Sequence, residues 1–279
     1  MNWQHVLAHP QLWLPRLKRK IQLARNPQAR AIFSLEDGLR FECALGDSAG
    51  RILTVAGAIE AAERKFVRQT LKPGDVFFDI GANLGLFTLT AARRVGPVGH
   101  VYAFEPSERE VLHLRRNLEL NQLSNVTVIT QAVSDECGTA RFAIAADGGN
   151  NSLRKNVHPQ QQIQAWQDVE VITLDAFVAA HTVPRVDMMK IDVEGAEVNV
   201  LRGAAHLLNG SHPPTILCEF CDATAAGFNS SGQALYDTFV SYGYQLFGLP
   251  ESDQGMLTPA PRQAHYDYEN LVGRKSAPA

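Results

Sequence analysis

Two short segments place chemically useful side chains at the ends of predicted strands. Residues 76–85 read VFFDIGANLG, an apolar run that ends in Asp79 and is followed by a glycine-bearing turn. Residues 102–106 read YAFEP and end a second strand at Glu105. Open α/β sheets bind ligands at the carboxyl ends of their parallel strands. A carboxylate at Glu105 can accept hydrogen bonds from both hydroxyls of a ribose. The pattern therefore predicts a nucleoside-cofactor site.

The order of residues in the first segment narrows the cofactor. A dinucleotide fingerprint would be G-x-G-x-x-G, whereas residues 79–85 read Asp-x-Gly-x-Asn-x-Gly. A carboxylate two residues before the first glycine disfavours a phosphate ligand. S-adenosylmethionine has no phosphate, and its ammonium suits Asp79, directly or through water. We therefore favour a methyltransferase over a nucleotide-dependent oxidoreductase or a purely structural turn.

Composition is that of an ordinary globular protein. The chain has 279 residues, of which 45% are hydrophobic and 20% charged, and its net charge is -3. This charge argues against binding to nucleic acid driven by overall charge. No run approaches the roughly 18 apolar residues of a membrane span, and no secretory signal is evident, so we expect a cytoplasmic protein. The four cysteines are too few for a disulfide framework, and we interpret Cys218 and Cys221 as core thiols.

The first 56 residues are predicted to form an extension before the main domain, which we place at residues 57–279. Residues 1–30 contain six Lys and Arg and no carboxylate. Leu14, Leu17 and Ile21 at helical spacing predict a short basic amphipathic helix after Pro15. It either packs its apolar face on the domain, which we favour, or lies on an anionic membrane surface or an acidic partner. Residues 31–56 are typical of strands, with a hairpin at Asp37-Gly38.

Strands and helices then alternate, which predicts a mostly parallel sheet covered on both faces. The expected strands are 76–80, 100–104, 126–133, 186–192, 215–220, 244–249 and 270–273, with further short strands at 141–145 and 169–174. The expected helices are 59–71, 84–95, 107–121, 192–208 and 234–242. Ser107 and Glu110 have the spacing of a capping box. A final helix-strand-loop-strand order is compatible with an antiparallel hairpin at one sheet edge.

With these motifs in view, the chain resembles the FkbM family of S-adenosylmethionine-dependent methyltransferases. The resemblance covers roughly residues 55–248 and rests on DIGANLG at 79–85, FEP at 104–106, AVSD at 132–135, TLD at 173–175 and KIDVEGAE at 190–197. It implies an α/β, doubly wound, mostly parallel seven-stranded class I sheet. It also implies methyl transfer to a hydroxyl of a sugar, glycolipid or other small-molecule acceptor. The acceptor itself and the oligomeric state are not predicted.

The resemblance assigns residues to each part of the cofactor. Asp79, Gly81, Asn83 and Gly85 would frame the methionine end, and Glu105 would hold the ribose. Ala132 and Val133 would lie against adenine. Many class I enzymes carry a carboxylate at the position of Ala132, and its absence leaves adenine recognition to backbone groups, Ser134 or Asp135.

Asp192, at the end of the fourth strand, is the residue we expect at the reactive centre and beside the cofactor. A carboxylate there can take the hydroxyl proton of the acceptor. Glu194 and Glu219 compete for this role, as does Glu197, although Glu194 and Glu197 are equally typical of a turn cap or a helix N-terminus. Clustered carboxylates raise the alternative of Mg²⁺, but spacing fixes no three ligands, and we predict no metal. A cofactor-binding interaction module without turnover is a further alternative.

Overall fold

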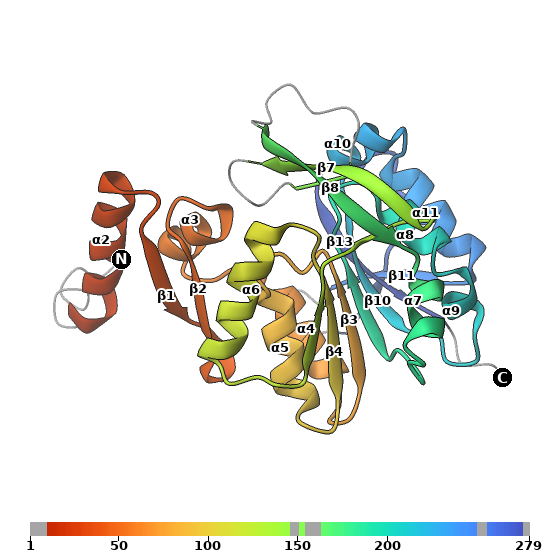
Figure 1. Cartoon of the computed structure of the whole chain (residues 1–279), viewed down its shortest axis with the longest axis horizontal. Helices are drawn as coiled ribbons and strands as arrows, with labels where there is room; N and C mark the ends of the chain where they lie inside the picture. Colours follow the sequence, from red (N-terminus) through yellow and green to blue (C-terminus); the bar gives the residue numbers. More distant parts are fainter. Residues whose placement is uncertain (1–9, 146–150, 154–162, 250–255, 276–279) are drawn as a thin grey trace.

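The computed structural model describes residues 10–145, 151–153, 163–249 and 256–275, with side chains from residue 17 onward. Its centre is an eight-stranded sheet in the order β12-β11-β13-β10-β9-β3-β4-β5 (Figure 1). The strands are β3 (Val76–Ile80), β4 (His100–Phe104), β5 (Val126–Ile129), β9 (Met188–Ile191), β10 (Thr215–Phe220), β11 (Gln245–Gly248), β12 (Thr258–Pro259) and β13 (Glu269–Arg274).

Most of this sheet is parallel, as the alternation of elements predicts. β4 pairs with β5 and β3, β3 with β9, and β9 with β10, all in parallel. β13 is inserted antiparallel between β10 and β11, so the predicted antiparallel ending is confirmed. The two-residue strand β12 pairs with β11 and adds an eighth strand to the seven expected. The α/β fold class predicted from the sequence is confirmed.

Helices cover both faces of the sheet. The helices are α4 (Ala61–Thr70), α5 (Leu86–Val95), α6 (Glu108–Leu120), α7 (Leu174–Ala180), α8 (Glu197–Arg202), α9 (Ala205–Asn209), α10 (Asp222–Ala225) and α11 (Gly232–Ser241). On one face Phe77 belongs to a core with residues of α4, α5 and α6. On the other face Phe78 belongs to a core with residues of α7, α8 and α11. Successive residues of β3 thus point into opposite cores, which explains why the strand is apolar throughout.

The N-terminal extension begins with α2 (Pro10–Arg25) and the predicted hairpin, formed by β1 (Arg30–Ser34) and β2 (Arg40–Ala44). The hairpin is attached to α6, because the Asn117 and Asn121 side chains accept the backbone N–H groups of Glu42 and Arg40, each at 2.8 Å. Figure 1 shows these elements at one end of the molecule, beside α6.

The sequence prediction of strands through residue 56 is wrong after β2. Ser48–Val55 forms a helix, α3, instead of a strand. Asp47, in an extended conformation, occupies the N-cap position of α3. Gly50 lets this helix lie against the end of β2, since a Cβ there would come within 2.0 Å of the Ala44 carbonyl oxygen.

Two further predictions differ from the structure. The strand predicted over 126–133 ends at Ile129, and Ala132–Val133 forms β6 of a separate three-stranded sheet, β6-β8-β7. Its other strands are β7 (Gly138–Ala145) and β8 (Ile163–Ile172), so the strand predicted over 169–174 begins earlier and stops before α7.

Two predicted features of the helices also differ from the structure. The helix predicted over 192–208 is two short helices, α8 and α9. Gly203 lies between them, and a Cβ there would meet the Ser134 carbonyl oxygen at 2.1 Å. At α6 the Ser107 hydroxyl donates to the Glu110 carboxylate and makes no side-chain cap to the backbone, so the predicted capping box is not formed as such.

The predicted basic helix exists, although it begins at Pro10 and not after Pro15, and it leaves apolar side chains open to solvent. Leu17 and Ile21 of α2 are each 45% exposed, so the packing that we favoured is not realised by these two residues. Across the described ranges, no helix combines the length and hydrophobicity needed to cross a membrane. All four cysteines are free, with Cys218 buried as predicted and Cys221 partly exposed.

Candidate functional site

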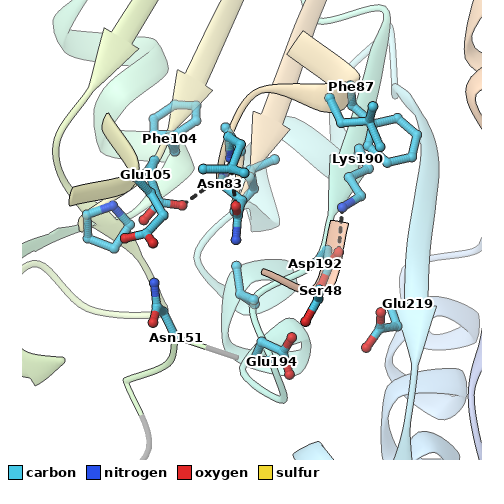
Figure 2. Close-up of a pocket in the computed structure, with 18 of the residues that line it drawn as sticks. Ser48, Asn83, Phe87, Phe104, Glu105, Asn151, Lys190, Asp192, Glu194 and Glu219 are labelled. Carbon is cyan, nitrogen blue, oxygen red and sulfur yellow. Dashed lines mark hydrogen bonds and ion pairs between the residues drawn. The ribbon is translucent and has the colours of Figure 1, made fainter. Parts of the chain in front are cut away.

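A cavity of about 520 Å³ opens at the carboxyl ends of β3, β4, β9 and β10, which is in the range of small-molecule sites. Eight of the residues predicted from the sequence line it: Gly81, Asn83, Glu105, Ala132, Val133, Asp192, Glu194 and Glu219. Asp79 and Gly85 do not belong to its wall. Figure 2 shows Glu105 and Asn83 on one side, with Asp192, Glu194 and Glu219 on the other.

The turn after β3 is pressed against the end of β9. A Cβ on Gly81 would lie 1.8 Å from the Asp192 carbonyl oxygen, and the φ of Gly81 is +83°. The backbone N–H groups of Gly81 and Ala82 both donate to the Phe104 carbonyl oxygen at 3.0 Å. Only glycine satisfies both the close approach and the left-handed conformation at residue 81. This turn therefore brings the ends of β3, β4 and β9 together around the cavity.

Glu105 connects this turn to the start of α6. Its Oε2 accepts the N–H of Asn83 and its Oε1 accepts the N–H of Ser107, each at 2.9 Å. Burial raises the pKa of Glu105 to about 8. Each carboxyl oxygen has two lone pairs and accepts only one of these N–H groups, so both oxygens keep capacity for ligand hydroxyls in either protonation state.

Asp79 lies behind the turn and is 1% exposed. Its Oδ2 accepts the Thr88 hydroxyl at 2.5 Å, and its Oδ1 has no hydrogen-bond partner among the described residues. Burial raises the pKa of Asp79, and the charge of Lys190 opposes that rise. An incompletely paired buried carboxyl next to a cavity rich in carboxylates fits a ligand that carries positive charge, as S-adenosylmethionine does.

Lys190 and Asp192 form the charged pair of the site. Lys190 Nζ lies 2.5 Å from Asp192 Oδ2 and 4.6 Å from the centre of the Phe87 ring (Figure 2). Burial alone would lower the pKa of Lys190, but the carboxylates of Asp192, Glu60 and Asp79 raise it, so the ammonium stays charged. Lys190 is thus paired with the neighbouring carboxylate of Asp192.

The carboxylates of the acidic turn after β9 differ in what they contact. Glu197 Oε1 accepts the N–H groups of Val193 and Gly195, each at 3.1 Å, and does not line the cavity. Glu197 therefore serves the turn, as its alternative interpretation predicts. Glu194 and Glu219 face the cavity, and burial together with Asp192 and Glu194 strongly raises the pKa of Glu219.

Backbone strain is concentrated around this cavity. Seven described residues other than glycine have positive φ, and three of them, Glu60 (45°), Asn83 (50°) and Glu194 (59°), line it. Such conformations cost about 1–2 kcal/mol per residue and persist only where the surrounding structure enforces them. Their clustering supports a functional role for this cavity.

Sequence reasoning missed part of the wall. The N-terminal extension contributes Ser48, Ala49 and Ile52 of α3, and Ile59 and Glu60 follow just before α4. The missed signal is Asp47-Ser48 after β2, which is typical of a helix N-terminus.

Two other wall residues come from loops. Tyr268 lies just before β13, far in sequence from every predicted site residue. Asn151 lies in a segment of which residues 146–150 are outside the described residues. Its Oδ1 accepts the Ala145 N–H at 2.7 Å.

Carboxylates are numerous here, but the described side chains contain no group of three or more His, Cys, Asp or Glu arranged to hold a metal ion. The arrangement offers hydrogen-bond acceptors at Glu105, an apolar wall at Ala132 and Val133, carboxylates at Asp192 and Glu194 that can accept a proton, and a carboxyl at Glu219 whose raised pKa favours its protonated form.

Comparison with known proteins gives one family. Residues 79–246 match the methyltransferase FkbM domain, more than half of the chain. The chain is 29% identical over 178 residues to Methyltransferase 1 of Beauveria bassiana, which covers 54% of this chain and 67% of that protein. It is 30% identical over 162 residues to 31-O-demethyl-FK506 methyltransferase FkbM of Streptomyces tacrolimicus, covering 48% and 60%.

Two other similarities are weaker. The chain is 27% identical over 163 residues to 2-O-methyltransferase NoeI of Sinorhizobium fredii, covering 52% of this chain and 63% of that protein. The chain thus spans about two thirds or less of these relatives. A solved S-adenosylmethionine-dependent O-methyltransferase from Thermotoga maritima superposes with a TM-score of 0.45 at 15% identity, covering 90% of this chain and 94% of that one.

Proposed function

This chain belongs to the methyltransferase FkbM domain family of S-adenosylmethionine-dependent methyltransferases, and we propose that it methylates a hydroxyl oxygen of a sugar, glycolipid or similar small molecule. The observation that carries the proposal is one continuous cavity. It joins the Glu105 carboxylate and the Gly81 turn to the Asp192 and Glu219 carboxylates. Glu105 and the Gly81 turn suit a nucleoside. The end of the cavity with Asp192 suits a hydroxyl that must lose a proton.

The chain's own residues bind and orient in this proposal. When bound, S-adenosylmethionine supplies a methyl group activated by a sulfonium. Glu105 holds the ribose hydroxyls, Ala132 and Val133 lie against adenine, and the turn at Gly81 and Asn83 receives the methionine portion. Asp79 and Gly85, which are off the wall, act by shaping that turn, and Asp79 also adds negative charge near the ammonium.

We assign proton removal to Asp192. Its side chain is 22% exposed, and Lys190 holds Oδ2, so Oδ1 has a fixed direction at the cavity wall. Positioning an acceptor hydroxyl against this carboxylate supplies both orientation and a base. Glu194 and Glu219 bind further groups of the acceptor in this scheme. Glu219 fits a hydrogen-bond donor role, because its raised pKa keeps the carboxyl protonated.

The acceptor is selected by segments outside the matched residues 79–246. Ile52 of α3, Ile59 and Tyr268 contribute apolar and aromatic surface to the wall. Related proteins are named as a hexuronic acid methyltransferase in Haloferax volcanii and as the 2-O-methyltransferase NoeI. A sugar, with hydroxyls for the carboxylates and an apolar face for Tyr268, fits such a wall. In this arrangement α3 of the extension completes the site of domain 57–279.

Labelled S-adenosylmethionine tests the proposal. The full chain is incubated with the labelled methyl donor and sugar-containing extracts, and labelled products are identified by mass spectrometry as a gain of one methyl group. Asp192→Asn should abolish the product while calorimetry still detects binding of the donor. Absence of donor binding by the unmodified chain would refute the proposal, and binding without any transfer would favour an interaction module.

We also propose a peripheral membrane contact through α2. Leu17 and Ile21 are exposed between Lys18, Lys20 and Arg25, a composition suited to an anionic lipid surface. Sedimentation with anionic liposomes should retain the full chain and lose a variant lacking residues 1–30. Equal retention of the two proteins contradicts this contact.

A further inference from the structure

Glu60 lines the cavity, but it belongs to no sequence motif and lies outside the family match. It precedes α4, outside the matched residues 79–246, and lines the cavity. Its backbone is left-handed, with φ 45° and ψ 43°. Glutamate rarely adopts this conformation, so the fold enforces a costly backbone where this carboxyl meets the cavity.

The wall of the cavity is rich in carboxyl groups, several of which have raised pKa values because they are buried close together. Its carboxylates are Asp47, Glu60, Glu105, Glu110, Asp192, Glu194 and Glu219. Lys190 is the one Lys or Arg on that wall within the described residues, and its ammonium is already paired with Asp192. Like charges close together destabilise one another in a poorly solvated site, so this cavity is suited to a ligand with positive charge.

Glu60 is surrounded by charged groups from several elements. The charges that act on it are those of Lys190 and Asp192 at the end of β9, Asp79 in β3 and Glu63 in the first turn of α4. The phenol of Tyr268 is also within electrostatic reach of Glu60. Burial raises the pKa of Glu60 to about 7, and Lys190 partly opposes this rise. A single additional cation nearby would therefore shift the carboxyl toward its ionised form.

We propose that Glu60 is a charge-selecting residue that makes the site bind S-adenosylmethionine in preference to its demethylated product. This inference rests on the proposed function. The methyl donor carries a sulfonium charge, whereas the product has a neutral thioether at the same sulfur. The carboxylate of Glu60, together with those of Asp79 and Asp192, attracts the sulfonium of the donor. The neutral thioether of the product gains less electrostatic attraction from the same groups. The same difference favours release of the product after transfer.

Two quantities depend on Glu60 in this proposal: proton release on binding, and the preference for donor over product. Near pH 7 the donor should release a fraction of a proton on binding, because its charge ionises Glu60, and the product should release less. Glu60→Gln should reduce the preference for donor over product by about tenfold, because it removes the charge and keeps the size of the side chain. Affinity for the product should change little.

Titration calorimetry on the full chain provides the test. Donor and product are titrated at pH 7 in two buffers of different ionisation enthalpy, with unmodified protein, Glu60→Gln and Glu119→Gln. Glu119 is an exposed carboxylate on α6, away from the cavity wall, so its variant is the matched control. Circular dichroism reports whether each variant is folded, and the buffer comparison on the unmodified chain needs no variant.

The outcomes separate this proposal from the function on which it rests. Equal proton release by donor and product, or equal weakening of both by Glu60→Gln, overturns the role of Glu60. A preference that Glu119→Gln reduces as much as Glu60→Gln also overturns it. If the unmodified chain binds neither compound, the proposed methyltransferase function fails instead.

Discussion

Lys190 Nζ lies 2.5 Å from Asp192 Oδ2, at the carboxyl end of the central strand β9. The lysine side chain is 6% exposed, and that of Asp192 is 22% exposed. Both residues line the cavity, so the pair has two consequences. It neutralises a buried ammonium, and it fixes the direction of the carboxylate to which we assign proton removal.

The first prediction concerns the stability of this pair. Lys190→Met should lower the free energy of unfolding by about 3 kcal/mol, because it leaves Asp192, Asp79 and Glu60 without their counter-charge. Urea denaturation followed by circular dichroism measures the change. The double variant Lys190→Met/Asp192→Asn should recover part of the loss, since it removes the unpaired carboxylate as well. A single variant as stable as the unmodified chain would show that the pair is solvated, contrary to its burial.

The second prediction is that stability falls as pH rises from 5.5 to 8. Glu60, Glu105 and Glu197 have folded-state pKa values of about 7, 8 and 7, all above the usual value for glutamate. The folded chain keeps these protons while the unfolded chain loses them from about pH 4.3 upward. Their stabilisation is complete below that value and is lost as pH passes through the folded pKa values. Linkage predicts a loss of about 2 kcal/mol for each of these groups over this window, which urea denaturation measures.

A variant isolates this effect from other groups. His100 and His113 have lowered pKa values, because burial disfavours their charge, and they change stability in the opposite direction over part of this window. Glu60→Gln should make the dependence on pH shallower, since an amide does not titrate. Glu119→Gln should leave it unchanged. A steeper or unaltered slope in Glu60→Gln would contradict the burial of this carboxyl.

The sheet could be predicted because its signals are local. Each parallel strand is an apolar run followed by a turn residue, and Asp79, Glu105 and Asp192 mark three strand ends that the parallel register then brings together. Parallel pairing is what places these distant residues at one edge. The prediction therefore needed only the strand boundaries and the direction of the crossovers.

The missing part of the site depends on packing between distant segments. Ile52 of α3 and Tyr268 are separated by the whole domain in sequence, and neither carries a pattern that connects it to Asp192. They reach the cavity because the hairpin is attached to α6 through Asn117 and because β13 is inserted beside β10. Glu60 is similar, since its left-handed conformation has no signature in the residue type.

The third prediction tests the close approach of the glycine turn with a matched pair of variants. Gly81→Ala and Gly96→Ala both place a Cβ on a residue with positive φ, +83° and +69°. At Gly81 the new Cβ would lie 1.8 Å from the Asp192 carbonyl oxygen, whereas nothing lies within 4 Å at Gly96. Gly96→Ala should cost about 1–3 kcal/mol of stability and leave donor binding intact. Gly81→Ala should cost more and abolish donor binding measured by calorimetry; equal effects would refute the constraint.

The fourth prediction separates Glu105 from Glu60. Glu105→Gln replaces one of two carboxylate oxygens that accept the N–H groups of Asn83 and Ser107, so an amide N–H must face a backbone donor. A buried donor left without an acceptor costs about 1–3 kcal/mol, so donor affinity should fall by about 10- to 100-fold. The adenosine portion is shared by the donor and its product, and the product should therefore weaken by the same factor.

The matched control for this fourth test is Glu108→Gln, on the exposed side of the first turn of α6, which should bind both compounds as the unmodified chain does. Calorimetry then gives the ratio of donor affinity to product affinity, which distinguishes the two ends of the cavity. Glu105→Gln should leave the preference for donor over product unchanged, whereas Glu60→Gln should reduce it. A change of preference in Glu105→Gln would place the charged sulfur beside Glu105 and reverse the orientation that we propose for the cofactor.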